Sequence, residues 1–524
     1  MPTEIELKLS LPLTGVAPLQ RNPLLKSLSI SSPVNHKLYS IYYDTPDLDL
    51  RSRRVALRLR REGRRWTQAV KGGGSVAAGL HQRQEFEVPV LGGQPDLTKI
   101  SNSSLARLFD VRVLREQLFP VFTTEFTRST RTLRLADGSE VEFCLDRGKI
   151  TADGASAPIC EIELELKSGN RLSLFQLALD LLHSVPDSVP LRLENVSKAE
   201  RGYALFSGRG SPPGKAMTVE LAAEMNTSEA FHTIASNCLD HLHNNEAGMR
   251  ERADPEYLHQ MRVALRRERS ALSVFSRAFS KSAFAEMVQE LRWIAGKLGP
   301  ARDWDVFVTK TIVPVCAAFP QHPGLQVLQE KCEKIREQHN DDACRAVESH
   351  NYTELMLKLG AWLSAEPWLD ADYHESSNLP ESGCGAPVVK FAEPLLAHRH
   401  RQLKKYGRKL ESLDTHQLHA LRIVVKKQRY AAEFFAGLYP QKETRHYIQS
   451  LSGLQEILGI INDVAIVERL LGERTLEGNQ DEENQGNERE AAGIIRGWSA
   501  SMASLKMREL GRGWRDFSKS PIFW

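Results

Sequence analysis

The spacing of apolar residues changes near residue 207, and this change constrains the fold more than any other feature of the chain. From residue 5 to about residue 162, short runs alternate polar and apolar residues, as at 55–60 (VALRLR) and 161–166 (EIELEL). Period two is typical of antiparallel strands with one apolar and one polar face. Beyond about residue 220, apolar residues recur with helical spacing. The pattern predicts an antiparallel β domain followed by an all-α domain.

A stretch rich in glycine, proline and serine separates the two patterns. Residues 207–214 read SGRGSPPG, a composition typical of a linker. A chain of 524 residues also exceeds the size at which a single core stops growing, roughly 250–300 residues. We therefore expect a first domain at 1–206, a linker at 207–221 and a helical domain at 222–515. Two polar stretches, 370–387 and 473–490, are predicted to be solvated loops between helices.

The composition favours a soluble protein that is not exported. Hydrophobic residues make up 41% and charged residues 26%, and no apolar run approaches the roughly 18 residues that span a bilayer. Residues 1–8 (MPTEIELK) carry acids where a signal peptide needs basic residues and an apolar stretch. The seven cysteines form no CxxC pair, as in proteins of reducing compartments. We expect a cytoplasmic location and no membrane partner.

Several predicted strands of the first domain concentrate charge on one face. Side chains two residues apart on a strand point the same way, so Glu4, Glu6 and Lys8 share a face. The same spacing relates Arg58 to Arg60, Arg83 to Glu85 and Glu87, and Glu161 to Glu163 and Glu165. For any single strand, a merely solvated face is the alternative. Several such strands closed into a barrel would enclose these charges, which must then pair with each other or with ligands.

A lumen with both signs of charge suits a chain of phosphates bound beside a metal ion. Arginine and lysine bind phosphate oxygens, and hard carboxylate oxygens bind Mg²⁺ or Mn²⁺. The candidate phosphate ligands are Lys8, Arg58, Arg60, Lys71, Arg83 and Arg128. The candidate metal ligands are Glu4, Glu6, Glu161, Glu163 and Glu165.

At these positions the first domain resembles the CYTH family, the triphosphate tunnel metalloenzymes. Residues 4–8 (EIELK) fit the family's ExExK motif, and the resemblance continues in order through 42–45 (YYDT), 57–60 (LRLR), 71–72 (KG), 85–87, 161–165 and 197–203. It implies an eight-stranded antiparallel tunnel in which basic residues hold a triphosphate and acids hold one or two divalent cations. It also implies that Asp146 is a metal ligand and that Lys198 is a catalytic residue, and leaves open whether Lys198 or Arg201 reaches the tunnel mouth.

The chemistry that this resemblance implies is attack by water on a terminal phosphorus, with the metal and the arginines neutralising the transferred phosphoryl group. Glu85, Glu87 and Glu165 are each candidates to orient the water. Residues 80–83 (LHQR) and the fusion to a helical domain resemble bacterial inorganic triphosphatases, so the expected reaction is hydrolysis of inorganic triphosphate to pyrophosphate and phosphate. The alternatives are an adenylate cyclase, a thiamine triphosphatase and a polyphosphate-binding protein with a weakly active tunnel.

The helical half repeats itself at an offset of 160 residues. Ten residues recur unchanged, among them Asp254 as Asp414 and Phe275 as Phe435, while Arg266 recurs as Lys426. So many identities at one fixed offset predict two similar helical halves, a pair of helical bundles.

One helical face in each half carries a basic stripe. Asp254 and Asp414 are predicted N-caps, with Pro255 in the first turn of the first copy. At about 100° per residue, the next side chains fall within an arc of roughly 80°. These are His259, Arg262, Arg266 and Arg269 in the first copy and His419, Arg422, Lys426 and Arg429 in the second. A solvated face is the alternative, but duplication at identical spacing favours two facing helices that form a groove for a polyanion.

Here the helical half resembles the CHAD family, the conserved-histidine α-helical domains. Residues 259–267 (HQMRVALRR) and 419–427 (HALRIVVKK) carry the resemblance. It implies two four-helix bundles related by pseudo-symmetry and binding of inorganic polyphosphate. We hypothesise that such binding brings the protein to polyphosphate granules or raises the local substrate concentration. Nucleic acid is a less favoured polyanion for the same surface. Asn462 stands where the first copy has Arg302, which predicts unequal contributions from the two halves.

Overall fold

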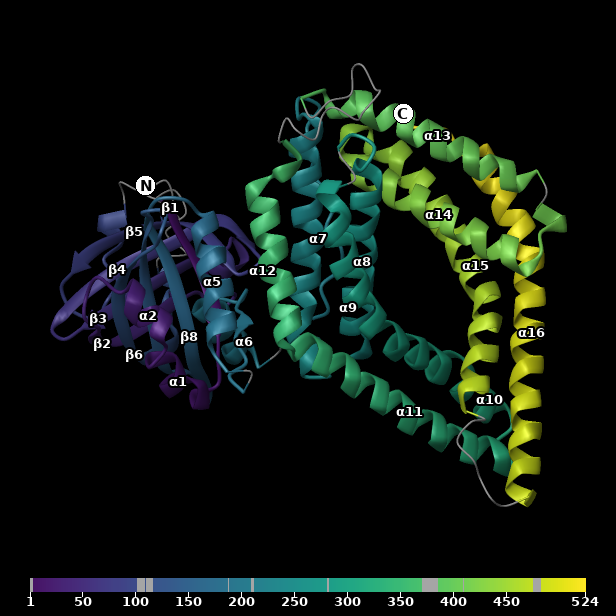
Figure 1. Cartoon of the computed structure of the whole chain (residues 1–524), viewed down its shortest axis with the longest axis horizontal. Helices are drawn as coiled ribbons and strands as arrows, with labels where there is room; N and C mark the ends of the chain where they lie inside the picture. The colour runs from purple at the N-terminus through teal and green to yellow at the C-terminus, as the bar shows by residue number, and fades with distance from the viewer. Residues whose placement is uncertain are drawn as a thin grey trace. The chain divides into compact units, whose positions relative to one another are not determined.

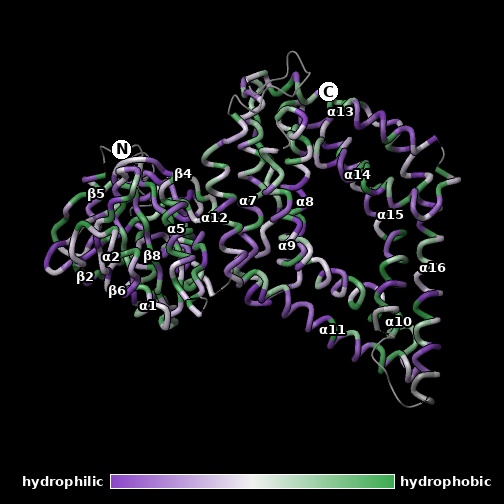
Figure 2. The backbone as a smooth tube through the Cα atoms, in the orientation of Figure 1, coloured by the Kyte–Doolittle hydropathy of each residue, from purple (hydrophilic) through white to green (hydrophobic). Residues whose placement is uncertain are grey.

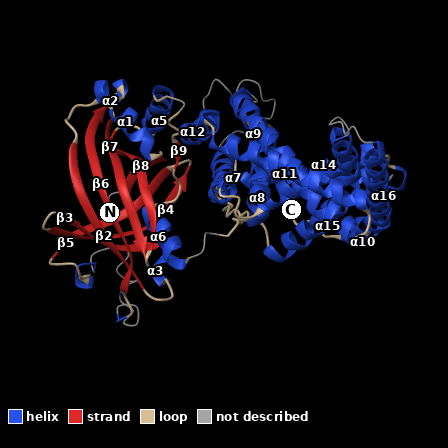
Figure 3. Ribbon diagram, turned by 90° about the horizontal axis from the view of Figure 1, so that it is seen from below, coloured by secondary structure: helices blue, strands red, loops and turns tan. Residues whose placement is uncertain are grey.

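The computed structural model describes residues 3–100, 109, 116–186, 188–208, 212–279, 282–369, 385–408, 410–474 and 482–524. The chain forms two compact units: Met1–Pro213 with Val347–Ala365, and Gly214–Ala346 with Glu366–Trp524. Strands occur in the first of these units, and the described part of the second is helical (Figure 1, Figure 3). Most of the predicted loop at 370–387 and residues 209–211 of the predicted linker lie outside the described residues.

A closed antiparallel barrel of eight strands forms the centre of the first unit. Its strands follow the order β5-β4-β3-β2-β6-β7-β8-β1, and pairing of β1 with β5 closes the ring. The strands are β1 Thr3–Ser10, β2 Val34–Asp44, β3 Val55–Glu62, β4 Arg65–Ala77, β5 Leu80–Val90, β6 Phe119–Arg134, β7 Glu140–Ala152 and β8 Ala155–Ser168. A short strand, β9 (Arg192–Leu193), extends β1 on one side. The eight-stranded antiparallel tunnel is therefore confirmed.

Alternation along the strands sorts apolar from charged side chains. On β3, Leu57 and Leu59 are fully buried in a cluster with Leu50 of α3 (Asp49–Ser52), outside the barrel wall. The residues between them, Arg58 and Arg60, point to the opposite face, the lumen. The remaining helices of the first unit are α1 Val16–Gln20, α2 Pro23–Leu28, α5 Leu172–Ser184, α6 Lys198–Ser207 and α12 His350–Ala365.

Helix α12 belongs to the first unit although its sequence neighbours on both sides belong to the second. It runs antiparallel to α5: Arg171, at the start of α5, donates a hydrogen bond to the Ser364 carbonyl (3.1 Å) near the end of α12. At Gly360 a Cβ would lie 2.4 Å from the Phe175 ring, so only glycine permits this approach. The Thr353 hydroxyl donates to the Leu191 carbonyl at 2.9 Å. Contacts at several points therefore hold α12 on the first unit.

The described residues of the second unit are helical, which confirms the predicted all-α half. Its helices are α7 Thr227–Arg250, α8 Pro255–Phe275, α9 Ser282–Phe307, α10 Val313–Ala318, α11 Pro323–Glu348, α13 Val388–Gly407, α14 Thr415–Phe435, α15 Gln441–Arg474 and α16 Glu482–Lys519. Hydrophilic and hydrophobic segments alternate along them (Figure 2), as expected of amphipathic helices.

The predicted loop at 473–490 is wrong over much of its length. Helix α15 extends to Arg474, and α16 already begins at Glu482. Glutamate, glutamine and arginine have good intrinsic helix propensity. The polar residues 482–490 are therefore the first turns of a helix whose next residue, Ala491, is fully buried.

The structure bears out the sequence repeat. The bounds of α8 and α14 differ by 160 residues at each end. The Asp254 side chain accepts a hydrogen bond from the Glu256 amide, and Asp414 forms a capping box with Gln417, so both predicted N-caps are confirmed. The repeat-related rings of Phe275 and Phe435 have centroids 6.0 Å apart, so the two halves share a core.

Among the described helices, α15 alone is long and apolar enough to span a membrane by length and composition. Residues 441–472 contain a window with a mean hydropathy of 1.3, of which 28% is buried. The helix packs along α14 and α16 and buries Leu451, Leu454 and Leu470. A helix within a bundle passes the same test of length and composition.

Candidate functional site

The barrel lumen contains a cavity of about 280 Å³ with charged walls. Strand alternation brings most of the lining residues to one face, and the start of α6 supplies three more. The lining residues are Glu4, Glu6 and Lys8 of β1, Tyr42 of β2, Ala56, Arg58 and Arg60 of β3, Lys71 of β4, Arg83, Glu85 and Glu87 of β5, Arg128 of β6, Glu163, Glu165 and Lys167 of β8, and Ser197, Lys198 and Ala199.

Two predicted metal ligands do not line this cavity. Asp146 of β7 and Glu161 of β8 are fully buried and bind cationic side chains instead. The Lys198 ammonium lies 2.7 Å from Asp146 and 2.9 Å from Glu163, and it also pairs with Glu161. The Lys198 ammonium therefore contacts all three carboxylates, and one oxygen from each carboxylate lies within 4.8 Å of the other two.

Two arginines complete this buried network. Arg128 binds Asp146 through two hydrogen bonds, of 2.8 and 2.7 Å, and also pairs with Glu163. Arg201 pairs with Glu161 and does not line the cavity. Of the two candidates for the tunnel mouth, Lys198 lines the cavity. Burial alone would raise the pKa of Asp146 and Glu163, but Lys198 and Arg128 outweigh it and hold both pKa values below their usual range.

We expect Lys198→Met to destabilise the protein because it leaves buried carboxylates without their main cation. Removing one partner of a buried ion pair costs about 3–5 kcal/mol of unfolding free energy. Urea denaturation followed by circular dichroism measures this loss. Lys167→Met, which changes a lysine of β8 whose side chain is 42% exposed, should cost far less. Equal midpoints for the two variants would contradict this assignment.

Glu6 of β1 and Glu165 of β8 differ from Asp146 and Glu163, because their pKa values are raised and not lowered. Glu6 and Glu165 are cross-strand partners. Burial raises the pKa of Glu6. The nearby Lys8 lowers this pKa, whereas Glu163 and Glu4 raise it further. Burial also raises the pKa of Glu165. The nearby Lys167 lowers this pKa, whereas Glu4 and Glu142 raise it further. Carboxylates that destabilise one another's charge would gain from a divalent cation, and their hard oxygens suit Mg²⁺ or Mn²⁺.

In the basic wall opposite them, Arg60 has no carboxylate partner among the described residues. Arg58 pairs with Glu85 at 3.0 Å and Glu87 at 2.8 Å, whereas Arg60 contacts only the Ser40 hydroxyl, at 3.5 Å, within the described part of the chain. Burial lowers the pKa of Arg60 to about 10, and the neighbouring Arg58 and Arg128 add to the effect. An anion in the lumen would offset this repulsion.

Sequence reasoning did not assign Tyr42 or Lys167 to the lumen, and it left open whether Arg201 reaches the tunnel mouth. Lys167 continues the alternation of 161, 163 and 165, so the spacing signal for it was present. Arg201 lies one helical turn after Lys198. The Tyr42 ring stacks on Phe122 with centroids 4.4 Å apart, a contact between residues far apart in sequence.

In the second unit, the two predicted basic stripes face each other. The Arg266 guanidinium lies 3.5 Å from the Tyr430 hydroxyl, which joins α8 to α14. Burial lowers the pKa of Lys426 to about 7, and Arg422 of the same helix and Arg266 and Arg262 of the facing helix lower it further. Burial likewise lowers the pKa of Arg262 to about 10. Mutual repulsion across the two helices marks a place suited to a polyanion.

The ends of the stripes are less alike than the repeat suggests. Arg429 donates to Gln455 at 2.8 Å and pairs with Glu433, whereas Arg269 is exposed. Burial, together with the nearby Arg302, lowers the pKa of His259 to about 4. His419, in contrast, lies 2.5 Å from the Asn462 amide oxygen. Asn462 and Arg302 thus give the two histidines different neighbours.

The closed barrel with its charged lumen and the repeated helical half define a fusion of two domain types. The family model for the CYTH domain matches residues 2–203, and that for the CHAD domain matches residues 233–472. The chain therefore joins a CYTH domain to a CHAD domain, as the motifs predicted.

Relatives of known sequence cover one or both parts. Over 206 residues the chain is 35% identical to an inorganic triphosphatase of Haemophilus influenzae, a match that covers 39% of this chain and 55% of that protein. It is 25% identical over 444 residues to an uncharacterized protein of Mycobacterium tuberculosis, covering 80% and 79% of the two chains. A crystal structure of the CHAD domain from the plant Ricinus communis is 33% identical, with a TM-score of 0.49, and covers 60% of this chain and 100% of that one. The chain thus matches only about half the length of the Haemophilus protein.

Proposed function

We propose that the CYTH domain hydrolyses inorganic triphosphate to pyrophosphate and phosphate with Mg²⁺ or Mn²⁺. The observation that carries this proposal is that the lumen has carboxylates on one wall and basic residues on the opposite wall. Burial and the neighbouring Glu4 raise the pKa of Glu6 and of Glu165, and Arg60 has a guanidinium without a carboxylate partner among the described residues. The similarity to the Haemophilus inorganic triphosphatase supports it.

Glu4 and Glu6 would hold the metal, which when bound supplies a Lewis acid for phosphoryl oxygens. Glu165, the cross-strand partner of Glu6, would accept a hydrogen bond from the attacking water, and its raised pKa suits a proton acceptor near neutral pH. Asp146 and Glu161 would act indirectly, because their carboxylates position the Lys198 ammonium.

The basic residues of the lumen bind and orient the phosphate chain. Arg60 has its charge free for an anion, while Glu85 and Glu87 fix the guanidinium of Arg58 in the wall. Lys71 is held by Glu4 and Glu85, each at 2.8 Å. Lys8, Arg83, Arg128, Lys167 and Lys198 are the other basic residues that line the cavity. Donors fixed before the substrate binds stabilise charge on the transferred group without reorganising.

Phosphate release from triphosphate, ATP and thiamine triphosphate, each with Mg²⁺ or Mn²⁺, tests the assignment. We expect the highest kcat/KM on inorganic triphosphate. No turnover of triphosphate with either metal would contradict the proposal and favour a binding protein with an inactive tunnel. Formation of cyclic AMP from ATP would instead identify a cyclase.

We further propose that the facing stripes of α8 and α14 bind inorganic polyphosphate. The supporting observation is the lowered pKa of Lys426, because a partly buried lysine surrounded by arginines is electrostatically suited to an anion. Binding there would raise the local substrate concentration for the tunnel and recruit the protein to polyphosphate granules.

Affinity for long-chain polyphosphate should fall as the pH rises. The pKa of Lys426 is about 7 in the free protein, so the side chain loses its charge above that pH, while a bound polyanion raises the pKa and requires proton uptake. Between about pH 6 and about pH 8 we expect a loss of about tenfold in affinity. Fluorescence anisotropy with labelled polyphosphate measures it. Lys426→Arg, which keeps its charge at pH 8, should flatten the profile, and an equally steep profile in that variant would rule out Lys426 as the titrating group.

A further inference from the structure

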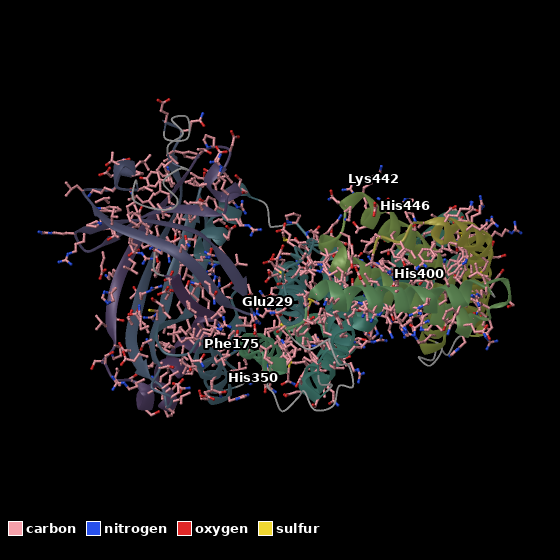
Figure 4. The ribbon with its side chains drawn as sticks, turned by 90° about the horizontal axis from the view of Figure 1, so that it is seen from above. Phe175, Glu229, His350, His400, Lys442 and His446 are labelled. Carbon is pink, nitrogen blue, oxygen red and sulfur yellow. The ribbon has the colours of Figure 1, made fainter. Side chains whose placement is uncertain are left out.

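A second cluster of metal-ligand side chains lies on the outside of the first unit. It joins His183, near the end of α5, to His350 and Glu354, one turn apart at the start of α12. One ligand atom from each lies within 4.8 Å of the other two. The His183 Nε2 atom is 3.5 Å from a Glu354 carboxylate oxygen, and the two imidazole rings have centroids 5.7 Å apart. Figure 4 labels His350 on α12 and Phe175 on the neighbouring α5.

The helices that carry these residues are fixed against each other before any ion binds. The close approach of Gly360 to Phe175, the Thr353 hydrogen bond and the Arg171 hydrogen bond hold α12 along its length. Arg192 also lies 3.4 Å from Glu348, just before the helix begins. Residues at i and i+4 share a helix face, so His350 and Glu354 present their ligand atoms to His183 together. Ligands placed on rigid elements need little reorganisation to bind a metal.

We propose that His183, His350 and Glu354 form a binding site for a borderline divalent transition metal such as Zn²⁺, separate from the tunnel. Two imidazoles and one carboxylate are a known ligand set for zinc, with the fourth position taken by water. Zinc bonds of about 2.0–2.2 Å place tetrahedral ligand atoms closer together than 4.8 Å, so small rotamer changes complete the geometry. Imidazole favours zinc over the hard Mg²⁺ that suits the carboxylates of the lumen.

A metal ion at this site would clamp α12 to α5. The cation must displace the Lys358 ammonium, which now lies 3.0 Å from the Glu354 carboxylate. Side chains at the site are accessible, since His183 is 53% and Glu354 25% exposed. The ion can therefore enter without opening the fold, and its binding would stabilise the attachment of α12.

Zinc titration of the full, chelator-treated chain in excess Mg²⁺ tests the site. Competition with a chromophoric chelator gives the number of bound ions and their affinity. We expect His183→Ala and His350→Gln each to weaken binding of one zinc ion by more than about tenfold. Zinc should also raise the thermal midpoint of the wild-type chain and leave that of both variants unchanged.

The matched control is His36→Ala. His36 lies 2.5 Å from Glu62 on the barrel, so it is also a surface histidine beside a carboxylate, but it does not belong to this three-residue group. Its loss should leave zinc binding intact. Equal zinc stoichiometry and affinity in the wild type and both cluster variants would overturn the proposal. Since no step requires triphosphate turnover, this result is independent of the activity proposed for the tunnel.

Discussion

Replacing Glu4 and Glu6 together by glutamine is expected to lower kcat/KM for inorganic triphosphate by on the order of 10³-fold. The change removes the hard oxygens that would hold the divalent metal and keeps the size of both side chains. Phosphate release at saturating Mg²⁺ or Mn²⁺ measures it. Polyphosphate binding by the CHAD domain should be unaffected.

The same variant is expected to remain folded. Lys8 keeps its pairing with Glu163, and Lys71 keeps Glu85 at 2.8 Å. Glu6 is buried with a raised pKa, so its neutral replacement removes a charge that burial disfavours. Glu140→Gln, on the barrel but paired with the exposed Arg134, is the matched control and should retain full activity. Full activity in the double variant would refute metal binding at Glu4 and Glu6.

Replacing Arg262 and Arg422 together by alanine should weaken polyphosphate binding by at least about 100-fold, because two charge-assisted contacts at roughly 1.5–3 kcal/mol each sum to roughly 3–6 kcal/mol. These two residues occupy equivalent places in the repeat and both contribute to the field at Lys426. Their removal should also reduce the salt dependence of binding, because fewer counterions are exchanged. Triphosphate hydrolysis in the CYTH domain should be unchanged.

The control for this pair removes two exposed arginines of the second unit. Arg345 and Arg496 have side chains that are 69% and 45% exposed. Their double alanine variant should bind polyphosphate as the wild type does. If it loses as much affinity as Arg262→Ala with Arg422→Ala, binding follows net charge and not the facing stripes. Competition between polyphosphate and RNA at matched salt would show which polyanion the groove prefers.

Local patterns predicted much of the fold. Period-two alternation located the strands and the lumen side of Arg58 and Arg60, because the geometry of a strand fixes the face of each side chain. The offset of 160 residues and the N-cap signals at Asp254 and Asp414 located α8 and α14. Each of these signals lies within a few residues of the feature it predicts, or repeats at a fixed spacing.

What the sequence did not reveal depends on contacts between distant residues. Nothing near Asp146 indicates that Lys198 and Arg128 neutralise it, so a buried ion pair and a metal ligand look alike in the sequence. The attachment of α12 to α5 depends on the close approach of Gly360 to Phe175, which helical periodicity does not encode. A polar composition poor in large apolar residues is typical both of a solvated loop and of the first turns of α16, so composition does not reveal where that helix starts.

The attachment of α12 has a consequence for the order in which the chain folds during synthesis. The barrel strands are complete by Ser168, but the helix that covers α5 ends at Ala365, after α7 to α11 of the second unit have been made. The first unit is therefore completed only after the first helices of the second unit have been synthesised. A fragment that stops at Pro213 would leave the α12-facing side of α5, which includes Phe175, in water. Domains generally fold as units in order of synthesis, and here the ribosome must deliver α7 to α11 of the helical unit before the tunnel domain acquires its last helix.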